Sequence, residues 1–190
     1  MPIRLGIDAS QPVASCAIST DGGVIVHGTI EKPIENFPIL IRDVVMRANI
    51  CLNDIEEIVV SIGPGSNMGV RTAVVTGNAL ALALNRPVTG ILSTDAAAII
   101  AKSDGIYKVA VSAGRRRWFV ESYSWQNDKL NRLDTMVLVE KLPENTNPSL
   151  YAIKNKFTEN ESCAYGILMV AEQQRHLILQ PMLDEVRPYK

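Results

Sequence analysis

The chain has 190 residues, 47% of them apolar, and its 19 basic and 20 acidic residues leave a formal net charge of −1. This length suits one ordinary domain or two small lobes. The charge balance excludes the broad positive surface of a protein that binds nucleic acid alone. Because no apolar run approaches the roughly 18 residues of a membrane-spanning helix, we expect a soluble cytoplasmic protein without a membrane partner.

Metal-ligating residues are sparse in this sequence. The cysteines Cys16, Cys51 and Cys163 are widely spaced, which is typical of buried thiols in a reducing compartment. The histidines His27 and His176 belong to no ligand pair. We therefore expect no metal site, which argues strongly against a zinc peptidase.

The first hundred residues predict a mixed α/β sheet with helices on its faces. Apolar and alternating segments predict the strands, and apolar residues at helical spacing predict the helices. The expected order is strand 3–9, strand 13–19, strand 24–30, helix 33–52, strand 55–62, a helix that ends at 85, strand 87–92 and helix 96–102 with its cap at 93–95.

The sequence pattern changes near residue 104, where a second and smaller lobe is expected to begin. We therefore divide the chain into lobes at 1–103 and 104–190. The elements expected in the second lobe are a β-meander of strands 107–113, 117–125 and 133–139, a loop at 143–148, a short strand and a last helix over 162–175.

A glycine-rich loop follows the buried strand at 55–62. Its glycines give the backbone access to positive φ, and its serine can cap the next helix. No Gly-Lys-Ser or Gly-Lys-Thr follows, so the loop is not a P-loop. We interpret it as a structural loop, with the important residues Gly63, Pro64, Gly65, Ser66, Gly69 and Arg71.

The helix after this loop carries no charged residue from 72 to 85. A surface helix normally has a charged face, so about four turns without one predict that both sides are covered. The sheet can cover one side, and a partner chain is the simplest cover for the other.

Two helix surfaces are therefore expected to form a partner interface. A step of 100° per residue places an apolar ridge on the outer side of the helix at 33–52, and the charge-free helix offers a similar outer side. Two such helices from each of two chains could close into a four-helix contact, which predicts a homodimer in isolation. The expected interface residues are Ile39, Asp43, Met46, Ile50, Val75, Ala79, Leu82 and Ala83.

Asp8 and Ser10 end the first strand, where phosphate-binding hairpins of the actin and sugar-kinase class place an Asp and a small hydroxyl residue. Such a site also needs a second glycine hairpin and a loop with paired glycines. After Gly90 the chain has only Gly105, Gly114 and Gly166. We interpret Asp8 and Ser10 as a vestigial cofactor site, with no catalytic residue and no cofactor of the chain's own.

In their order along the chain these residues resemble the TsaB (YeaZ) family, non-catalytic subunits of the bacterial machinery that makes N6-threonylcarbamoyladenosine in tRNA. The resemblance covers residues 1–125. The segments that carry it are Asp8-Ala9-Ser10, Gly63-Pro64-Gly65-Ser66, Gly69-Val70-Arg71 and Ala113-Gly114-Arg115-Arg116-Arg117.

The resemblance implies an actin-like (ASKHA) fold of two lobes, with helices of the first lobe binding a catalytic paralogue, TsaD, or a second copy of the chain. It implies that tRNA is met only through that complex, which ATP and a TsaE-like ATPase would join. It also relates the chain to the M22 glycoprotease-like family.

Two other functions stay open on the sequence alone. One is an active small-molecule kinase or ATPase of the same fold, with Asp8 orienting metal-bound phosphate, and the other is an M22-type peptidase. The role of the run Arg115, Arg116 and Arg117 is open too. It is either a solvated hairpin turn or a contact to a partner or to tRNA phosphate.

Overall fold

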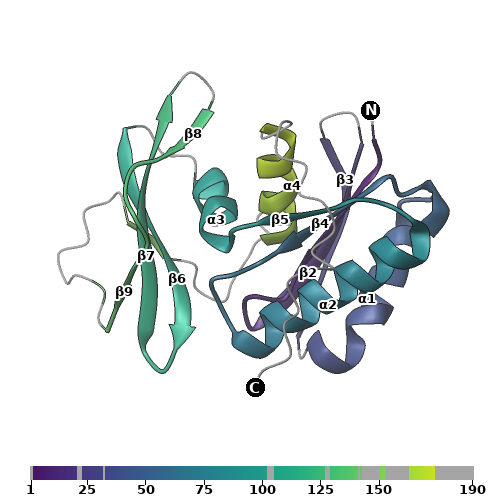
Figure 1. The fold of residues 1–190 in the computed structure, drawn as a ribbon, viewed down its shortest axis with the longest axis horizontal. Helices are drawn as coiled ribbons and strands as arrows, with labels where there is room; N and C mark the ends of the chain where they lie inside the picture. The colour runs from purple at the N-terminus through teal and green to yellow at the C-terminus, as the bar shows by residue number, and fades with distance from the viewer. Residues whose placement is uncertain are drawn as a thin grey trace.

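Two β-sheets and their flanking helices form the computed structural model of the chain (Figure 1). The helices are α1 (Pro33–Arg47), α2 (Asn67–Leu84), α3 (Ser93–Ala101) and α4 (Cys163–Gln173). The strands are β1 (Arg4–Asp8), β2 (Val13–Thr20), β3 (Gly23–Glu31), β4 (Glu57–Ser61), β5 (Val88–Ile91), β6 (Ile106–Gly114), β7 (Arg117–Gln126), β8 (Lys129–Arg132), β9 (Val137–Val139) and β10 (Leu150–Ala152). The structure describes residues 2–20, 23–31, 33–101, 105–126, 129–140, 142, 150–152 and 163–173, and no helix in these ranges is long and apolar enough to cross a membrane.

The first sheet has the strand order β3-β2-β1-β4-β5. β1 lies in its middle, antiparallel to β2 and parallel to β4, and every residue of β1 is buried. Side chains alternate across the sheet, so Leu5 and Ile7 face the core under α1 and α2 while Gly6 and Asp8 point to the other face. The predicted mixed sheet with helices on its faces is confirmed.

The other face of the first sheet is covered by α4, which contacts β1, β2 and β4. A Cβ atom on Gly6 would lie 2.8 Å from Leu168 Cγ and 3.0 Å from the Ala164 carbonyl oxygen, so α4 approaches the β1 backbone directly. α4 comes from the C-terminal part of the chain yet packs on the N-terminal sheet. The division of the chain at residue 103 stays a prediction.

α3 lies between the two sheets (Figure 1). It contributes Ala96 and Ile99 to the core with α4, and Ala97 and Ala98 to the core under the second sheet with Tyr107. Its small side chains allow α3 to be buried on every side.

The prediction of a single third strand of the meander at 133–139 is wrong. The structure instead has two short strands, β8 and β9, which both pair with β7. Between them the Asp134 carboxylate accepts a hydrogen bond from the Ser122 amide at 2.7 Å, and the Leu133 amide donates to the Ser122 carbonyl. A side chain therefore takes the place of a strand partner here, and the chain bends away.

Two helix boundaries also differ from the predictions. α1 ends at Arg47, five residues early, because Asn49 adopts a left-handed conformation (φ 54°) that turns the chain back toward the core. α3 begins at Ser93, whose amide donates to the Gly63 carbonyl at 2.7 Å. That contact satisfies the first amide, so residues 93–95 join the helix.

Candidate functional site

The glycine-rich loop packs directly on the end of β1. The Ser66 amide donates to the Ser10 carbonyl at 2.7 Å, and Ser66 Oγ caps α2 by accepting from the Gly69 amide at 3.4 Å. A Cβ atom on Gly65 would lie 2.3 Å from the Ser10 carbonyl oxygen, and one on Gly69 would lie 1.7 Å from the Ala9 carbonyl oxygen. Glycine is therefore required at both positions by close backbone approach.

Asp8 and Ser10, the expected phosphate-binding residues, are closed off from solvent at 0% and 1% exposure. Asp8 Oδ1 accepts a hydrogen bond from the Ser10 amide at 3.2 Å. Asp8 Oδ2 and Ser10 Oγ have no hydrogen-bond partner among the described residues. The first residue of α4, Cys163, lies beside the carboxyl group. Asp8 is therefore closed to solvent, with the start of α4 packed beside it.

Burial also acts on the ionisation of this carboxyl group. Burial raises the pKa of Asp8, and the side chains of Ser10, Ser61 and Cys163 oppose only part of that effect. Burial raises the pKa of the Cys163 thiol as well, and the Asp8 carboxylate adds to the rise. Both shifts favour the protonated forms of the two buried groups.

Asp8→Asn is expected to raise the free energy of unfolding relative to the wild type at neutral pH. The pKa of Asp8 in the folded chain lies above its unfolded value of ~3.9. The contribution of Asp8 to the free energy of unfolding is therefore full below pH ~3.9 and is lost as the pH rises through the folded pKa. Asparagine keeps the Oδ1 acceptor and cannot ionise. Urea unfolding from pH 5 to pH 8 should show the gain growing with pH.

Asp43→Asn is the matched control, because Asp43 is an exposed carboxylate on α1 and its substitution should show no such trend. If the stability of Asp8→Asn relative to the wild type falls as the pH rises, the buried and protonated state assigned to Asp8 is wrong.

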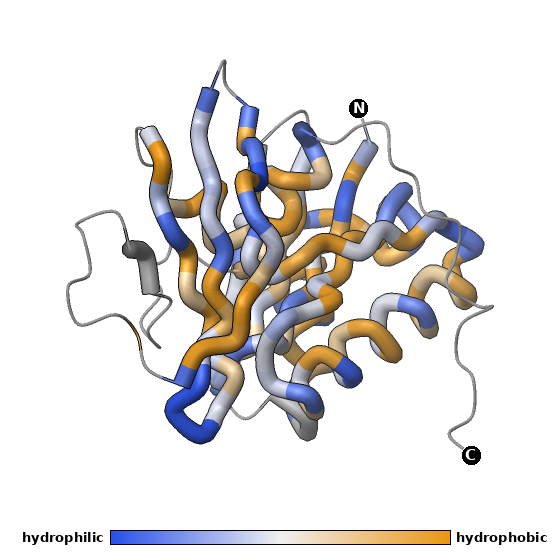
Figure 2. Tube along the Cα trace, turned by 60° about the vertical axis from the view of Figure 1, so that its left-hand side comes forward, coloured by the Kyte–Doolittle hydropathy of each residue, from blue (hydrophilic) through white to orange (hydrophobic). Residues whose placement is uncertain are grey.

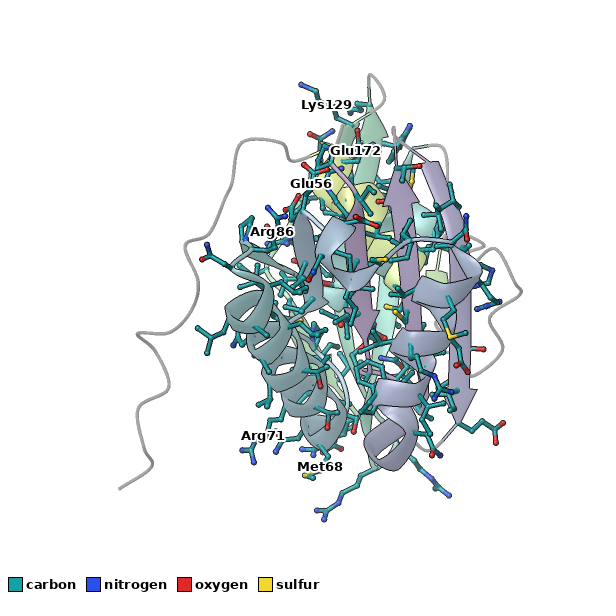
Figure 3. The ribbon with its side chains drawn as sticks, turned by 90° about the vertical axis from the view of Figure 1, so that its right-hand side faces the viewer. Glu56, Met68, Arg71, Arg86, Lys129 and Glu172 are labelled. Carbon is teal, nitrogen blue, oxygen red and sulfur yellow. The ribbon has the colours of Figure 1, made fainter. Side chains whose placement is uncertain are left out.

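The outer sides of α1 and α2 expose large apolar side chains, and the two helices lie side by side on one face of the first sheet (Figure 3). Ile39 and Met46 on α1 are 45% and 68% exposed, and Val75 and Leu82 on α2 are 66% and 70% exposed. The other predicted residues that lie on this exposed side are Asp43, Ala79 and Ala83. We call this surface the α1–α2 face.

Ile50 does not belong to the α1–α2 face. It lies beyond the end of α1, is half-buried and packs against the core under α1 and α2. The left-handed Asn49 just before it explains why helical spacing could not place this side chain.

The inner side of α2 is a stripe of small residues. Gly69, Ala73, Gly77 and Ala81 are its buried residues, one per turn. A Cβ atom on Gly77 would lie 2.2 Å from Val60 Cγ1, so the helix rests directly on β4. The sheet covers this side and leaves the opposite apolar side exposed in the single chain.

A second polar cluster, which the sequence did not predict, joins α3 to the second sheet. Arg132 Nη2 lies 2.8 Å from each carboxylate oxygen of Asp95, and Arg132 Nε lies 2.9 Å from Glu121 Oε1. The Tyr123 hydroxyl lies 2.8 Å from Asp95 and 2.7 Å from Glu121. Burial and the Asp95 charge raise the pKa of Tyr123, so its hydroxyl stays a donor. Because these four side chains bind one another, we interpret the cluster as a structural link between α3 and the second sheet.

Within the described ranges, no group of three or more His, Cys, Asp and Glu residues could hold a metal ion. Cys16, Cys51 and Cys163 are free thiols, and Cys51 alone is exposed. The candidate sites that remain are the closed Asp8 site and the exposed α1–α2 face.

Comparison with known proteins decides the family. The family model TsaD, described as tRNA N6-adenosine threonylcarbamoyltransferase, matches residues 12–170. The chain belongs to the TsaD family. A TsaD-family relative, the tRNA N6-adenosine threonylcarbamoyltransferase of Clostridioides difficile, is 36% identical over 92 residues, which cover 47% of this chain and 27% of that protein. The chain thus spans about a quarter of the length of this curated relative.

Two solved structures share the fold of this TsaD-family chain. YeaZ from Pseudomonas aeruginosa aligns with a TM-score of 0.77 at 16% identity, covering 96% of this chain and 97% of that one. A Pseudomonas aeruginosa protein described as similar to peptidase YeaZ aligns with a TM-score of 0.76 at 18% identity, covering 96% and 97%. The predicted relation to the TsaD family is confirmed, and the chain has the fold of YeaZ.

Proposed function

We propose that the chain is a non-catalytic partner subunit of the machinery that makes N6-threonylcarbamoyladenosine in tRNA, and that it scaffolds a TsaD-like catalytic paralogue. The observation that carries the proposal is the α1–α2 face, where Ile39, Met46, Val75 and Leu82 are each at least 45% exposed. Contiguous apolar surface of this kind has no use in a monomer and marks a protein interface.

The shape of the α1–α2 face favours a helical partner. Val75, Ala79, Leu82 and Ala83 follow helical spacing, and the alanines between the larger side chains let another helix approach closely. A related chain with the same two helices could pack against them as a four-helix contact. We propose a homodimer in isolation, replaced by a heterodimer when the paralogue is present.

The burial of Asp8 supports a non-catalytic role for this chain. Because Asp8 is fully buried beside α4, we propose that any ATP used by the complex is bound by another subunit, for which a TsaE-like ATPase is a candidate. The net charge of −1 gives this chain no broad basic surface, so we propose that the other subunits hold most of the tRNA and that this chain adds a local contact at most. We propose a cytoplasmic location, in keeping with a role in tRNA modification.

Association tests this proposal directly. The wild-type chain and the TsaD-like protein of the same organism, purified separately and mixed, should elute together in size-exclusion chromatography with light scattering as a one-to-one complex. The chain alone should elute as a dimer. Separate elution of the two proteins, with a monomeric chain at high concentration, would contradict the proposed role.

The isolated chain should release no phosphate from ATP above background, and Asp8→Ala should leave that background unchanged. The reason is again the burial of Asp8, which keeps phosphate and metal away from its carboxyl group. Phosphate release measured with and without Mg²⁺ checks this expectation. Steady hydrolysis that disappears in Asp8→Ala would instead favour the kinase or ATPase alternative.

A further inference from the structure

The turn between β6 and β7 places arginines in a backbone conformation that disfavours them. Gly114 pairs with Arg117, so Arg115 and Arg116 are the central residues of a two-residue hairpin turn, at φ 51° and 63°. Turns with positive φ at both central positions normally contain Asn-Gly. Strained backbone positions cluster at functional sites, so two arginines here motivate a functional hypothesis.

The arginines of this turn have no partner within the part of the chain that the structure describes. Arg115, Arg116 and Arg117 are exposed, and no hydrogen bond or ion pair joins their side chains to any described residue. The turn itself is well supported, because β6 and β7 pair along their length and the Gly114 amide donates to Ser112 Oγ at 3.3 Å. The paired hairpin thus exposes three guanidinium groups that have no partner among the described residues.

A fourth free arginine lies at the same end of the molecule. The β6–β7 turn is the hydrophilic blue loop at the lower edge of Figure 2, and Arg71 near the start of α2 is labelled at the lower edge of Figure 3. Arg71 is exposed, and the first turn of α2 contains no acidic residue to offset the positive end of the helix dipole. Positive charge therefore collects at this end, and no ion pair among the described residues joins an acidic side chain to these four arginines.

Arg71 also borders the α1–α2 face. It precedes Val75 by one helical turn and thus continues the outer stripe of α2 toward the hairpin. A molecule that contacts both Arg71 and the β6–β7 turn would lie at the edge of the surface assigned to the catalytic partner.

We propose that Arg71, Arg115, Arg116 and Arg117 bind the phosphate backbone of tRNA and guide it toward that partner. This inference rests on the proposed function, in which the chain belongs to a tRNA-modifying complex. Guanidinium forks match phosphate oxygens, and a phosphate backbone repeats its charge at short intervals, so arginines on two separate elements can be engaged at once. The turn offers no apolar side chain of the kind that anchors a protein partner.

The test uses Arg115→Asn with Arg116→Gly, which installs the residues that this turn prefers. The double variant should unfold at higher urea concentration than the wild type, because the backbone strain is removed. It should nevertheless bind unmodified tRNA more weakly, since two phosphate contacts are lost. Fluorescence anisotropy with labelled tRNA and the full chain, between about 50 and 200 mM KCl, measures both affinity and salt dependence.

The matched control is Arg42→Gln with Arg86→Gln, which removes the same charge elsewhere. Arg42 is exposed on α1, and Arg86 lies beyond the other end of α2 from Arg71 (Figure 3). The turn variant should lower the slope of log affinity against log salt concentration by about 2, one for each phosphate contact, while the control keeps the wild-type slope.

Three results would overturn the inference: no measurable tRNA binding by the wild-type chain at low salt, equal affinities for the turn variant and the control, or loss of binding to the TsaD-like protein with tRNA binding unchanged. The last result would assign the turn to a protein partner instead. Because the titration uses this chain and tRNA alone, its outcome is separate from whether the proposed heterodimer forms.

Discussion

Met46→Glu combined with Leu82→Glu is expected to give a folded monomer that no longer binds a TsaD-like paralogue. Both side chains are mostly exposed in the single chain, so the substitutions should leave the fold intact. In a complex the same positions would bury two carboxylates without partners, and that penalty exceeds what an apolar contact of this size can offset. The expected loss of affinity is at least about 100-fold, and light scattering with the mixed proteins measures it.

Ile25→Glu combined with Ile106→Glu is the matched control. These isoleucines are also exposed, but they lie on β3 and β6, outside the α1–α2 face. The control should dimerise and bind the paralogue as the wild type does. Continued association of the Met46 and Leu82 variant would show that the interface lies elsewhere.

Gly69→Ala should destabilise the chain by about 3 kcal/mol, the largest stability effect that we expect from a single methyl group. The added carbon would lie 1.7 Å from the Ala9 carbonyl oxygen, and a backbone atom cannot rotate away as a flexible side chain can. α2 would have to lift from β1 and take the glycine-rich loop with it. Urea unfolding monitored by circular dichroism measures the change.

Gly23→Ala provides the comparison, because the nearest atom to its added carbon, the Thr20 carbonyl oxygen, lies 3.9 Å away. This variant should stay within about 0.5 kcal/mol of the wild type. Equal unfolding midpoints for the two variants would mean that α2 does not approach β1 as closely as described.

Local sequence patterns predicted the N-terminal half well. β4, the glycine-rich loop and α2 follow one another as an apolar run, a turn with Gly63 and Gly65, and a capping serine. Each of these signals acts over a few residues, so the sequence alone carries it. The exposed apolar sides of α1 and α2 were also predictable, because helical spacing fixes which residues share a side.

Features that depend on distant residues were not predictable. The bend between β8 and β9 depends on one hydrogen bond from the Ser122 amide to Asp134. The cluster around Arg132 joins α3 to two strands that pattern alone does not bring together. The burial of Asp8 beside α4 depends on that helix returning to the first sheet from more than a hundred residues away, which the local motif at Asp8 could not indicate.

Formation of N6-threonylcarbamoyladenosine in a reconstituted reaction is the most direct test of the proposed role. The reaction contains unmodified tRNA, the TsaD-like protein and its other partners, with the wild-type chain, the Met46 and Leu82 variant, or no chain, and modified nucleoside is measured by mass spectrometry. The account predicts full modification with the wild type and equal, background levels with the variant and without the chain. Equal modification in all three reactions would contradict it.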